Sequence, residues 1–192
     1  MPPFLGDPQK DVGRSPYVAT VKEVIDALGT SLHRCLILRG WLAYRAELLK
    51  LELDGFQWVA GSFCEDVSFR VPSRTPPEPD DIDIVTFVRL PEGADGAALA
   101  TGLVKKRELF NPLSKQKFKC DAYFGAVVAA NHVDLQFATY WYGLFSHRRT
   151  DFQWKGLLRV ELASNDPEAA DALAEIEQSL ALAIPVTVGD DR

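Results

Sequence analysis

The order in which helical and strand patterns follow one another along this chain constrains its fold most. Two helical patterns come first, and apolar strand segments then alternate with further helical ones until a last helix opens at Asp166-Pro167. Helices are expected at 15–28, 30–51, 95–110, 131–145 and 166–182, and strands at 56–60, 82–88, 118–124 and 157–162. This order favours a small mixed α/β (α+β) domain, with a mixed β-sheet flanked by helices, over a helical bundle or a β-sandwich.

The chain length of 192 residues fits one domain. Residues 1–14 carry Pro, Gly and mixed charges, so we expect a flexible leader followed by a single domain over 15–186. Within that domain we expect an N-terminal helical hairpin (15–52), a core that carries the chemistry (56–162) and a C-terminal helix (166–182). The hairpin is interpreted as a packing element.

The bulk composition excludes several classes of protein. A formal net charge of -6 argues against non-specific coating of nucleic acid, so such a partner would need a local basic patch. Cys35, Cys64 and Cys120 are odd in number and widely spaced, which favours buried free thiols over disulfides or a zinc site. Neither an apolar signal-peptide core nor an apolar run of membrane-spanning length occurs, so we expect a cytoplasmic protein without a membrane partner.

Two aspartates open the strand at 82–88. Strand alternation places Asp81 and Asp83 on one face and Ile82 and Ile84 on the other, toward the core. Two neighbouring carboxylates cannot both stay ionised at low cost without a cation. Oxygen-only ligands suit Mg²⁺ or Mn²⁺, so we predict that Asp81 and Asp83 bind such an ion.

A third carboxylate would complete a two-metal site. Asp121 lies among apolar residues of the strand at 118–124, and the alternative to a metal ligand is an ion pair with Lys119 or an arginine. Gly61 and Ser62 follow the strand at 56–60, where a glycine allows a phosphate to approach the backbone and a serine can donate to it. Taken alone, a Gly-Ser pair is also typical of a simple tight turn.

Residues 56–124, with this order of Gly-Ser turn and acidic strands, resemble the polymerase-β-type nucleotidyltransferase superfamily. The chain is also similar to the bacterial DUF6932 family of small nucleotidyltransferase-like proteins. That likeness rests on GFQWVAGSFCEDVSFRVPSRTPPEPDDIDIVTF, SPYVATVKEVIDAL, RGWLAYRAELLKL and WYGLFSHRRTDFQWKGLLRVEL. The sequence departs from the superfamily in the length of the Pro-rich loop between Ser62 and Asp81, which leaves the route of substrate entry open.

The resemblance implies a nucleotidyltransferase fold in which Asp81, Asp83 and Asp121 hold the metals and act in catalysis, and Gly61 and Ser62 bind the nucleotide phosphates. It implies transfer of a nucleoside monophosphate from a nucleoside triphosphate, such as ATP, to an unidentified acceptor hydroxyl. By analogy with small members of the superfamily, a toxin–antitoxin or defence setting is expected. Two alternatives stay open: a non-catalytic nucleotide- or partner-binding module on the same fold, and a phosphohydrolase using the same acids.

Other charged and aromatic residues carry weaker expectations. Lys155 is a candidate contact for the triphosphate, and Arg70 and Arg74 are either phosphate contacts or ordinary loop charges. Glu65 and Asp66 are either further acids near the metals or, as we expect, solvated turn residues, and Asp80 is interpreted as a loop residue. The basic residues Lys105, Lys106, Arg107, Lys115, Lys117 and Lys119 either hold nucleic acid or pyrophosphate or, as we expect, form a solvated face. The aromatic stretch 137–145 is interpreted as core rather than as a base-stacking platform, and no role is assigned to His33, His132 and His147. The pattern gives no expectation for the oligomeric state.

Overall fold

The computed structural model describes residues 1–7, 9–10, 12–65, 78–90, 96–127, 132–149 and 151–183. Arg70, Arg74 and Asp66 therefore lie outside the described residues. The elements in chain order are β1 (Tyr17–Val18), α1 (Val21–Leu28), α2 (Leu32–Leu49), β2 (Gly55–Ala60), the 3₁₀ turn η1 (Ser62–Cys64), β3 (Ile82–Arg89), α3 (Gly96–Val104), the 3₁₀ turn η3 (Arg107–Leu109), α4 (Leu113–Phe118), β4 (Cys120–Val127), α5 (His132–Phe145), β5 (Leu158–Glu161) and α6 (Asp166–Leu182).

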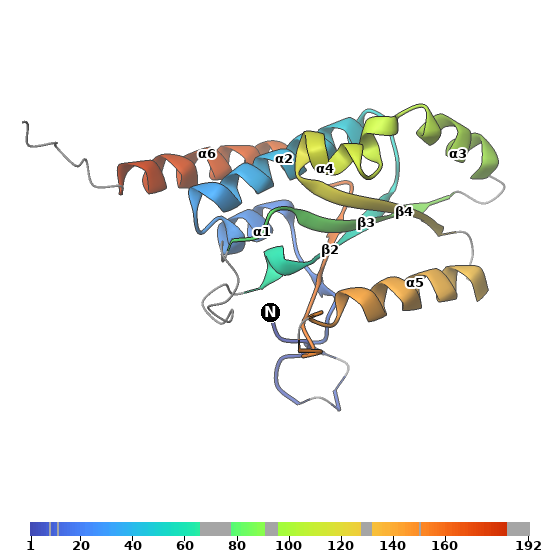
Figure 1. The fold of residues 1–192 in the computed structure, drawn as a ribbon, viewed down its shortest axis with the longest axis horizontal. Helices are drawn as coiled ribbons and strands as arrows, with labels where there is room; N and C mark the ends of the chain where they lie inside the picture. The colour runs from blue at the N-terminus through green and yellow to red at the C-terminus, as the bar shows by residue number, and fades with distance from the viewer. Residues whose placement is uncertain are drawn as a thin grey trace, which may run out of the picture.

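The strands form one mixed sheet in the order β1-β5-β2-β3-β4. The pairs β1·β5 and β3·β4 are parallel, whereas β2 is antiparallel to both of its neighbours. Helices cover both faces: α2, α4 and α6 lie on one side of β3 and β4, and α5 lies on the other (Figure 1). The expected mixed α/β domain, with a β-sheet flanked by helices, is confirmed.

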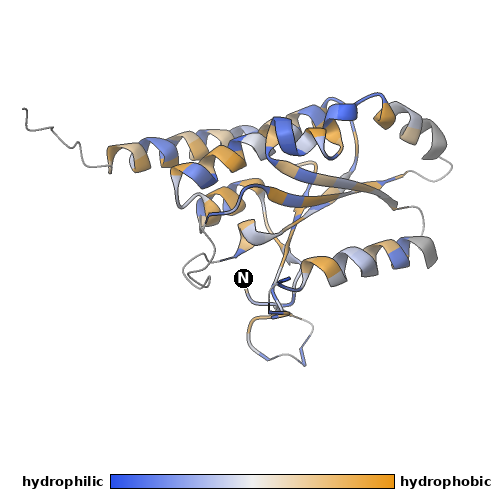
Figure 2. Ribbon diagram, in the orientation of Figure 1, coloured by the Kyte–Doolittle hydropathy of each residue, from blue (hydrophilic) through white to orange (hydrophobic). Residues whose placement is uncertain are grey.

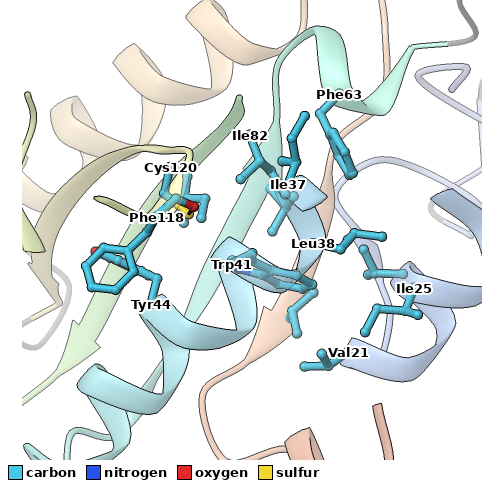
Figure 3. Close-up of a cluster of buried hydrophobic side chains, with 14 of the residues drawn as sticks. Val21, Ile25, Ile37, Leu38, Trp41, Tyr44, Phe63, Ile82, Phe118 and Cys120 are labelled. Atoms are coloured by element: carbon cyan, nitrogen blue, oxygen red, sulfur yellow. Dashed lines mark hydrogen bonds between the residues drawn. The ribbon is translucent and has the colours of Figure 1, made fainter. Parts of the chain in front are cut away.

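Two apolar clusters separate these layers. The larger cluster joins α1, α2 and α6 to one face of the sheet; Figure 3 shows residues of α1 and α2 pointing toward Ile82, Phe63 and Cys120. The smaller cluster packs Val85 and Phe87 against Trp141 and Phe145 of α5 on the opposite face. Hydrophobic residues accordingly recur between hydrophilic ones along α2, α5 and α6 (Figure 2). The predicted alternation of the β3 side chains is confirmed, as is the core role of Trp141 and Phe145.

The three cysteines are buried free thiols, as predicted. Burial raises the pKa of Cys64 to about 12 and that of Cys120 well above its usual value, so both thiols stay protonated near neutral pH. In the described part of the chain, no helix combines the length and apolar character needed to cross a membrane.

The first helix begins later than the sequence pattern predicted. Tyr17 and Val18 form a short strand that pairs with Leu158 and Arg159 of β5, so the prediction of a helix from residue 15 is wrong. The helix begins after Thr20, whose hydroxyl accepts from the Glu23 N–H while the Glu23 carboxylate accepts from the Thr20 N–H. This capping box satisfies two backbone donors that would otherwise lack partners.

The region between β3 and β4 also differs from expectation. The single helix predicted at 95–110 is divided into α3 and η3, and α4 occupies residues that were not assigned to a helix. Gly40 of α2 explains how α4 packs so closely: a Cβ at Gly40 would lie 2.1 Å from the Phe118 carbonyl oxygen. Lys119 then ends α4 in the left-handed conformation and lies outside β4, although the sequence pattern placed it in the strand expected at 118–124.

The residues expected to form a leader contact the domain. The N-terminal amine of Met1 donates to the Cys64 carbonyl (3.2 Å), and the Gly156 N–H donates to the Met1 carbonyl (2.8 Å). These contacts bring the start of the chain beside η1 and the segment that precedes β5.

Candidate functional site

A cavity of about 260 Å³ lies at the edge of the sheet where β2 ends and β3 and β4 begin. The strand register brings these ends together, because Asp83 pairs with Ala60 of β2 on one side and with Asp121 of β4 on the other. The cavity is lined by Gly61, Ser62, Glu65, Asp80, Asp81, Asp83, Lys115, Asp121, Leu144, Phe145, His147, Arg148, Arg149 and Lys155. All six residues predicted for the site, Gly61, Ser62, Asp81, Asp83, Asp121 and Lys155, therefore line one cavity.

The Asp83 carboxylate lies at the centre of the acidic group. Burial, and after it the negative charges of Asp81 and Asp121, raise its pKa to about 6, while Lys155 and Arg149 act in the opposite direction. An acid with this environment binds either a proton or a cation more readily than an exposed aspartate does.

The other two aspartates each have a partner that the sequence pattern did not reveal. The Lys115 ammonium of α4 lies 2.5 Å from Asp81 Oδ2, and this contact raises the pKa of Lys115. The Asn111 amide donates to Asp121 Oδ1 at 2.6 Å, and it also lies 3.3 Å from the Tyr123 hydroxyl. Lys115 belongs to the basic stretch that was interpreted as a solvated surface, and its place in the cavity corrects that interpretation.

Gly61 has a conformation and a contact that only glycine accommodates. Its φ is +78°, and a Cβ would lie 1.7 Å from Asp83 Oδ2. Ser62 begins η1 directly afterwards, and the Glu65 N–H donates to the Ser62 carbonyl (3.2 Å). The Gly-Ser pair thus brings the backbone against the acidic group, which a simple surface turn would not do.

Cationic side chains also line the cavity. Lys155, whose side chain is mostly buried, pairs with Glu65 at 3.0 Å, and Arg148 approaches the same carboxylate at 3.8 Å. Glu65 is therefore an internal partner of two cations, which corrects its interpretation as a solvated turn residue. Arg149 also lines the cavity.

One loop residue and one histidine also line the cavity. Asp80 lies in the loop before β3, as expected, but it lines the cavity, and so does His147, for which no role was expected.

The buried Arg34 of α2 donates to the carbonyl oxygens of Phe63 (2.8 Å) and Glu65 (2.9 Å) and so holds the turn that follows β2. A charged residue on the apolar face of a predicted helix is the one signal that could have identified Arg34.

The donor set fits a hard divalent cation in its chemistry. Asp83 and Asp121, from the adjacent strands β3 and β4, and Asp81, which directly precedes β3, offer carboxylate oxygens, the ligand type that Mg²⁺ prefers. Within the described residues, however, no three acidic, histidine or cysteine side chains converge as a preformed metal cluster. Asp81 faces Lys115 instead, so its use as a ligand requires that ion pair to open.

Comparison with known proteins yields one finding. No curated protein and no solved structure matches this chain. A family model described as "Family of unknown function (DUF6932)" matches residues 2–161, a range that contains every residue lining the cavity. The chain therefore belongs to the DUF6932 family.

Proposed function

We propose that this protein is a Mg²⁺-dependent nucleotidyltransferase of the polymerase-β type, which transfers a nucleoside monophosphate from a nucleoside triphosphate to an acceptor hydroxyl. One observation carries the proposal. Asp81 directly before β3, Asp83 of β3 and Asp121 of its parallel neighbour β4 line the same cavity as Gly61, and cationic side chains line it too. An acidic group beside cations suits a phosphate chain that arrives with divalent cations.

The residues of the cavity would have separate roles in the reaction. Mg²⁺ or Mn²⁺ held by Asp81, Asp83 and Asp121 would neutralise charge on the triphosphate. The backbone at Gly61 and Ser62 binds phosphate oxygens, and Lys155 contacts them when its pair with Glu65 opens.

The bond changes in the proposed transfer are balanced. The acceptor oxygen forms a bond to the α-phosphorus, the bond from that phosphorus to the α–β bridging oxygen breaks, and pyrophosphate leaves with that oxygen. The acceptor hydroxyl gives its proton to the Asp121 carboxylate, which Asn111 orients through its hydrogen bond. Positioning and charge neutralisation provide the rate acceleration, so no covalent intermediate with the protein is required.

The test is transfer of label from each α-labelled nucleoside triphosphate to components of a cell lysate or to tRNA, with Mg²⁺ or Mn²⁺ present. We expect a labelled product, with release of pyrophosphate rather than orthophosphate. Asp83→Asn and Asp121→Asn should each lower the transfer rate at least about 100-fold. Asp26→Asn, on the exposed surface of α1, is the matched control and should leave transfer unchanged.

Normal transfer by Asp83→Asn would contradict the mechanism, and release of orthophosphate would favour a phosphohydrolase. A non-catalytic nucleotide-binding module is the second candidate. It is favoured by one observation, the Lys115–Asp81 ion pair, which neutralises part of the acidic group with the chain's own ammonium. Nucleotide binding without transfer to any lysate component would support this second candidate.

A further inference from the structure

A second, more apolar recess adjoins the acidic cavity. It has a volume of about 550 Å³ and is lined by Gly143, Leu144, His147, Arg148, Arg149, Phe152 and Trp154. We call it the aromatic recess. It shares Leu144, His147, Arg148 and Arg149 with the acidic cavity, so the two spaces are adjacent.

Backbone contacts between the end of α5 and residues 152–155 build the aromatic recess. The Lys155 N–H donates to the Ser146 carbonyl (2.7 Å), the Arg148 N–H donates to the Gln153 carbonyl (2.9 Å), and His147 and Trp154 form an antiparallel bridge. The His147 ring packs edge-on against the Trp154 ring, with 4.8 Å between the ring centroids. The position of Trp154 is therefore fixed by its neighbours.

The two aromatic residues of the recess are nevertheless exposed. Trp154 is 62% exposed and Phe152 is 77% exposed, and Leu144 lies beside them. Large apolar side chains that gather at an exposed recess, rather than singly, are typical of a binding surface. Beside a phosphate-binding cavity, a flat aromatic face offers a place for a base to stack.

The charges around the recess fit the same ligand. Among the described residues, no carboxylate lines it, whereas Arg148 and Arg149 do. Arg148 is already paired with Glu65 and Asp151, but no carboxylate of the described chain lies within ion-pair distance of Arg149. Arg149 lies at the boundary and is close enough to Asp83 to lower its pKa. Arg149 is thus placed to contact a phosphate of a nucleotide that lies across the boundary between the two spaces.

The size of the acidic cavity decides which part of a nucleotide lies where. At about 260 Å³ it is smaller than the roughly 300–1,000 Å³ of pockets that enclose whole small-molecule ligands. Its wall is mostly charged, and its apolar residues Leu144 and Phe145 lie at the end of α5, next to the aromatic recess. A triphosphate and its cations would occupy this cavity and leave the base to the adjoining apolar space.

We infer that the aromatic recess binds the base of the donor nucleoside triphosphate, which stacks on Trp154 while Arg149 contacts its phosphates. This inference rests on the proposed function, because it takes the acidic cavity as the triphosphate site. Stacking on an aromatic face tolerates all four bases, so the recess should discriminate little between ATP, GTP, CTP and UTP.

The experiment compares binding of each nucleoside triphosphate with binding of inorganic tripolyphosphate, by calorimetry with Mg²⁺ present. We expect the nucleotides to bind about tenfold more tightly than tripolyphosphate, since stacking of one base supplies a gain of this order. Trp154→Leu should remove that difference and leave tripolyphosphate binding unchanged, and Trp154→Phe should restore most of it. Tyr140→Leu is the matched control, because Tyr140 is an exposed aromatic residue of α5 outside the recess.

The outcomes separate this inference from the proposal on which it rests. Equal affinity for nucleotides and tripolyphosphate, or unchanged nucleotide binding by Trp154→Leu, overturns the base site and leaves the triphosphate site intact. In that case the exposed aromatic residues would be assigned to a protein partner instead. Failure of wild-type protein to bind either ligand overturns both the base site and the proposed function. Circular dichroism of each variant excludes unfolding as the cause of a loss.

Discussion

Among the single side chains of the cavity, the Asp83 carboxylate has the least favourable environment for its charge. Its pKa of about 6 in the folded protein lies above the ordinary value of 3.8, so ionised Asp83 destabilises the fold. Asp83→Asn keeps the shape and removes the charge. In EDTA at pH 7.5, we expect this substitution to raise the free energy of unfolding by roughly 1–3 kcal/mol. Urea denaturation measures the difference.

The pH dependence of that difference follows from the direction of the pKa shift. The penalty is complete well above pH 6, shrinks as pH falls through 6 toward the ordinary value of 3.8, and disappears below that value, where Asp83 is protonated in both states. The stability curves of wild type and Asp83→Asn should therefore converge at low pH. Asp26→Asn serves as the control, because Asp26 lies on the exposed surface of α1 away from the acidic group and its removal should change the stability little at any of these pH values. Lower stability of Asp83→Asn at pH 7.5 would contradict this account.

Gly61 allows a double-mutant test of its contact with Asp83. Gly61→Ala should cost about 2–4 kcal/mol, because the new Cβ would meet Asp83 Oδ2 and because φ is positive. In an Asp83→Ala background the contact with the carboxylate is gone and only the Cβ of residue 83 stays near, at 3.0 Å, so the cost should fall to about 1–3 kcal/mol, mostly from the backbone. Chemical denaturation of the four proteins gives the coupling energy. A cost that stays the same in both backgrounds would show that the two residues do not touch.

Strand alternation explains why some of these residues were predictable from sequence. It placed Asp81 and Asp83 on one face, and the apolar segment around Asp121 predicted a neighbouring strand. Lys115 and Asn111 were not predictable, since their places depend on how α4 packs between α2 and β4 and not on a local pattern. Local periodicity reports which face a side chain occupies, but not which distant charge will lie opposite it.

Helix α4 brings Lys115 to the acidic cavity, and this gives a prediction for the element. A cation that binds Asp81 must displace the Lys115 ammonium, and this half-exposed ion pair is worth about 0.5–1 kcal/mol. Lys115→Met should therefore bind Mg²⁺ about two- to fivefold more tightly, and Mg²⁺ should raise its unfolding temperature by more than that of wild type. Thermal denaturation over a range of Mg²⁺ concentrations measures both effects.

Lys117, two residues further along α4 and therefore on the opposite face of the helix, supplies the matched control. Its ammonium lies over the Phe118 ring and it does not line the cavity. Lys117→Met should leave the Mg²⁺ dependence of stability as in wild type. If Lys117→Met and Lys115→Met respond alike, the effect reflects the general charge of α4, and the idea of a specific counter-ion at Asp81 fails.

The elements themselves were predictable in proportion to their length and periodicity. The long helices α2 and α6 and the strand β3 follow clear patterns, and their positions agree closely with expectation. The six-residue helix α4 and the two-residue strand β1 are too short to be stable alone, so they form only where packing supports them. Gly40 illustrates this dependence on packing. A glycine is needed there because the Phe118 backbone approaches closely, and no local sequence pattern reveals that approach.

The whole molecule extends beyond the residues that the family model matches. The match ends at residue 161, yet α6 begins at Asp166 and buries Ala169, Ala172 and Leu173 in the larger cluster. Directly after β5, the Leu162 N–H donates to the Gly55 carbonyl of β2 (2.9 Å) and so continues the pairing of these strands. Because α6 packs on α1 and α2, we expect it to belong to the same cooperative unit as the sheet that carries the cavity.

The connection between α6 and the sheet passes through one buried arginine. Arg45 of α2 is 1% exposed, and it donates to both carboxylate oxygens of Asp166 at 2.7 and 2.9 Å. It also donates to Gln57 of β2 (3.0 Å) and to the Glu161 carbonyl of β5 (3.0 Å). Four elements therefore share one charged centre, and removal of the guanidinium leaves the Asp166 carboxylate without its partner in a buried place.

Arg45→Met should accordingly lower the free energy of unfolding by about 3–5 kcal/mol. The matched control is Arg39→Met, because Arg39 also joins α2 to α6, through Glu177, but is 65% exposed; its loss should cost less than about 1 kcal/mol. Unfolding of Arg45→Met should stay a single transition when it is followed by circular dichroism and by fluorescence of the buried Trp41 and Trp141 together. Two separate transitions would mean that α6 detaches before the sheet opens, and the cavity would then lie on a smaller cooperative unit than the contacts of Arg45 indicate.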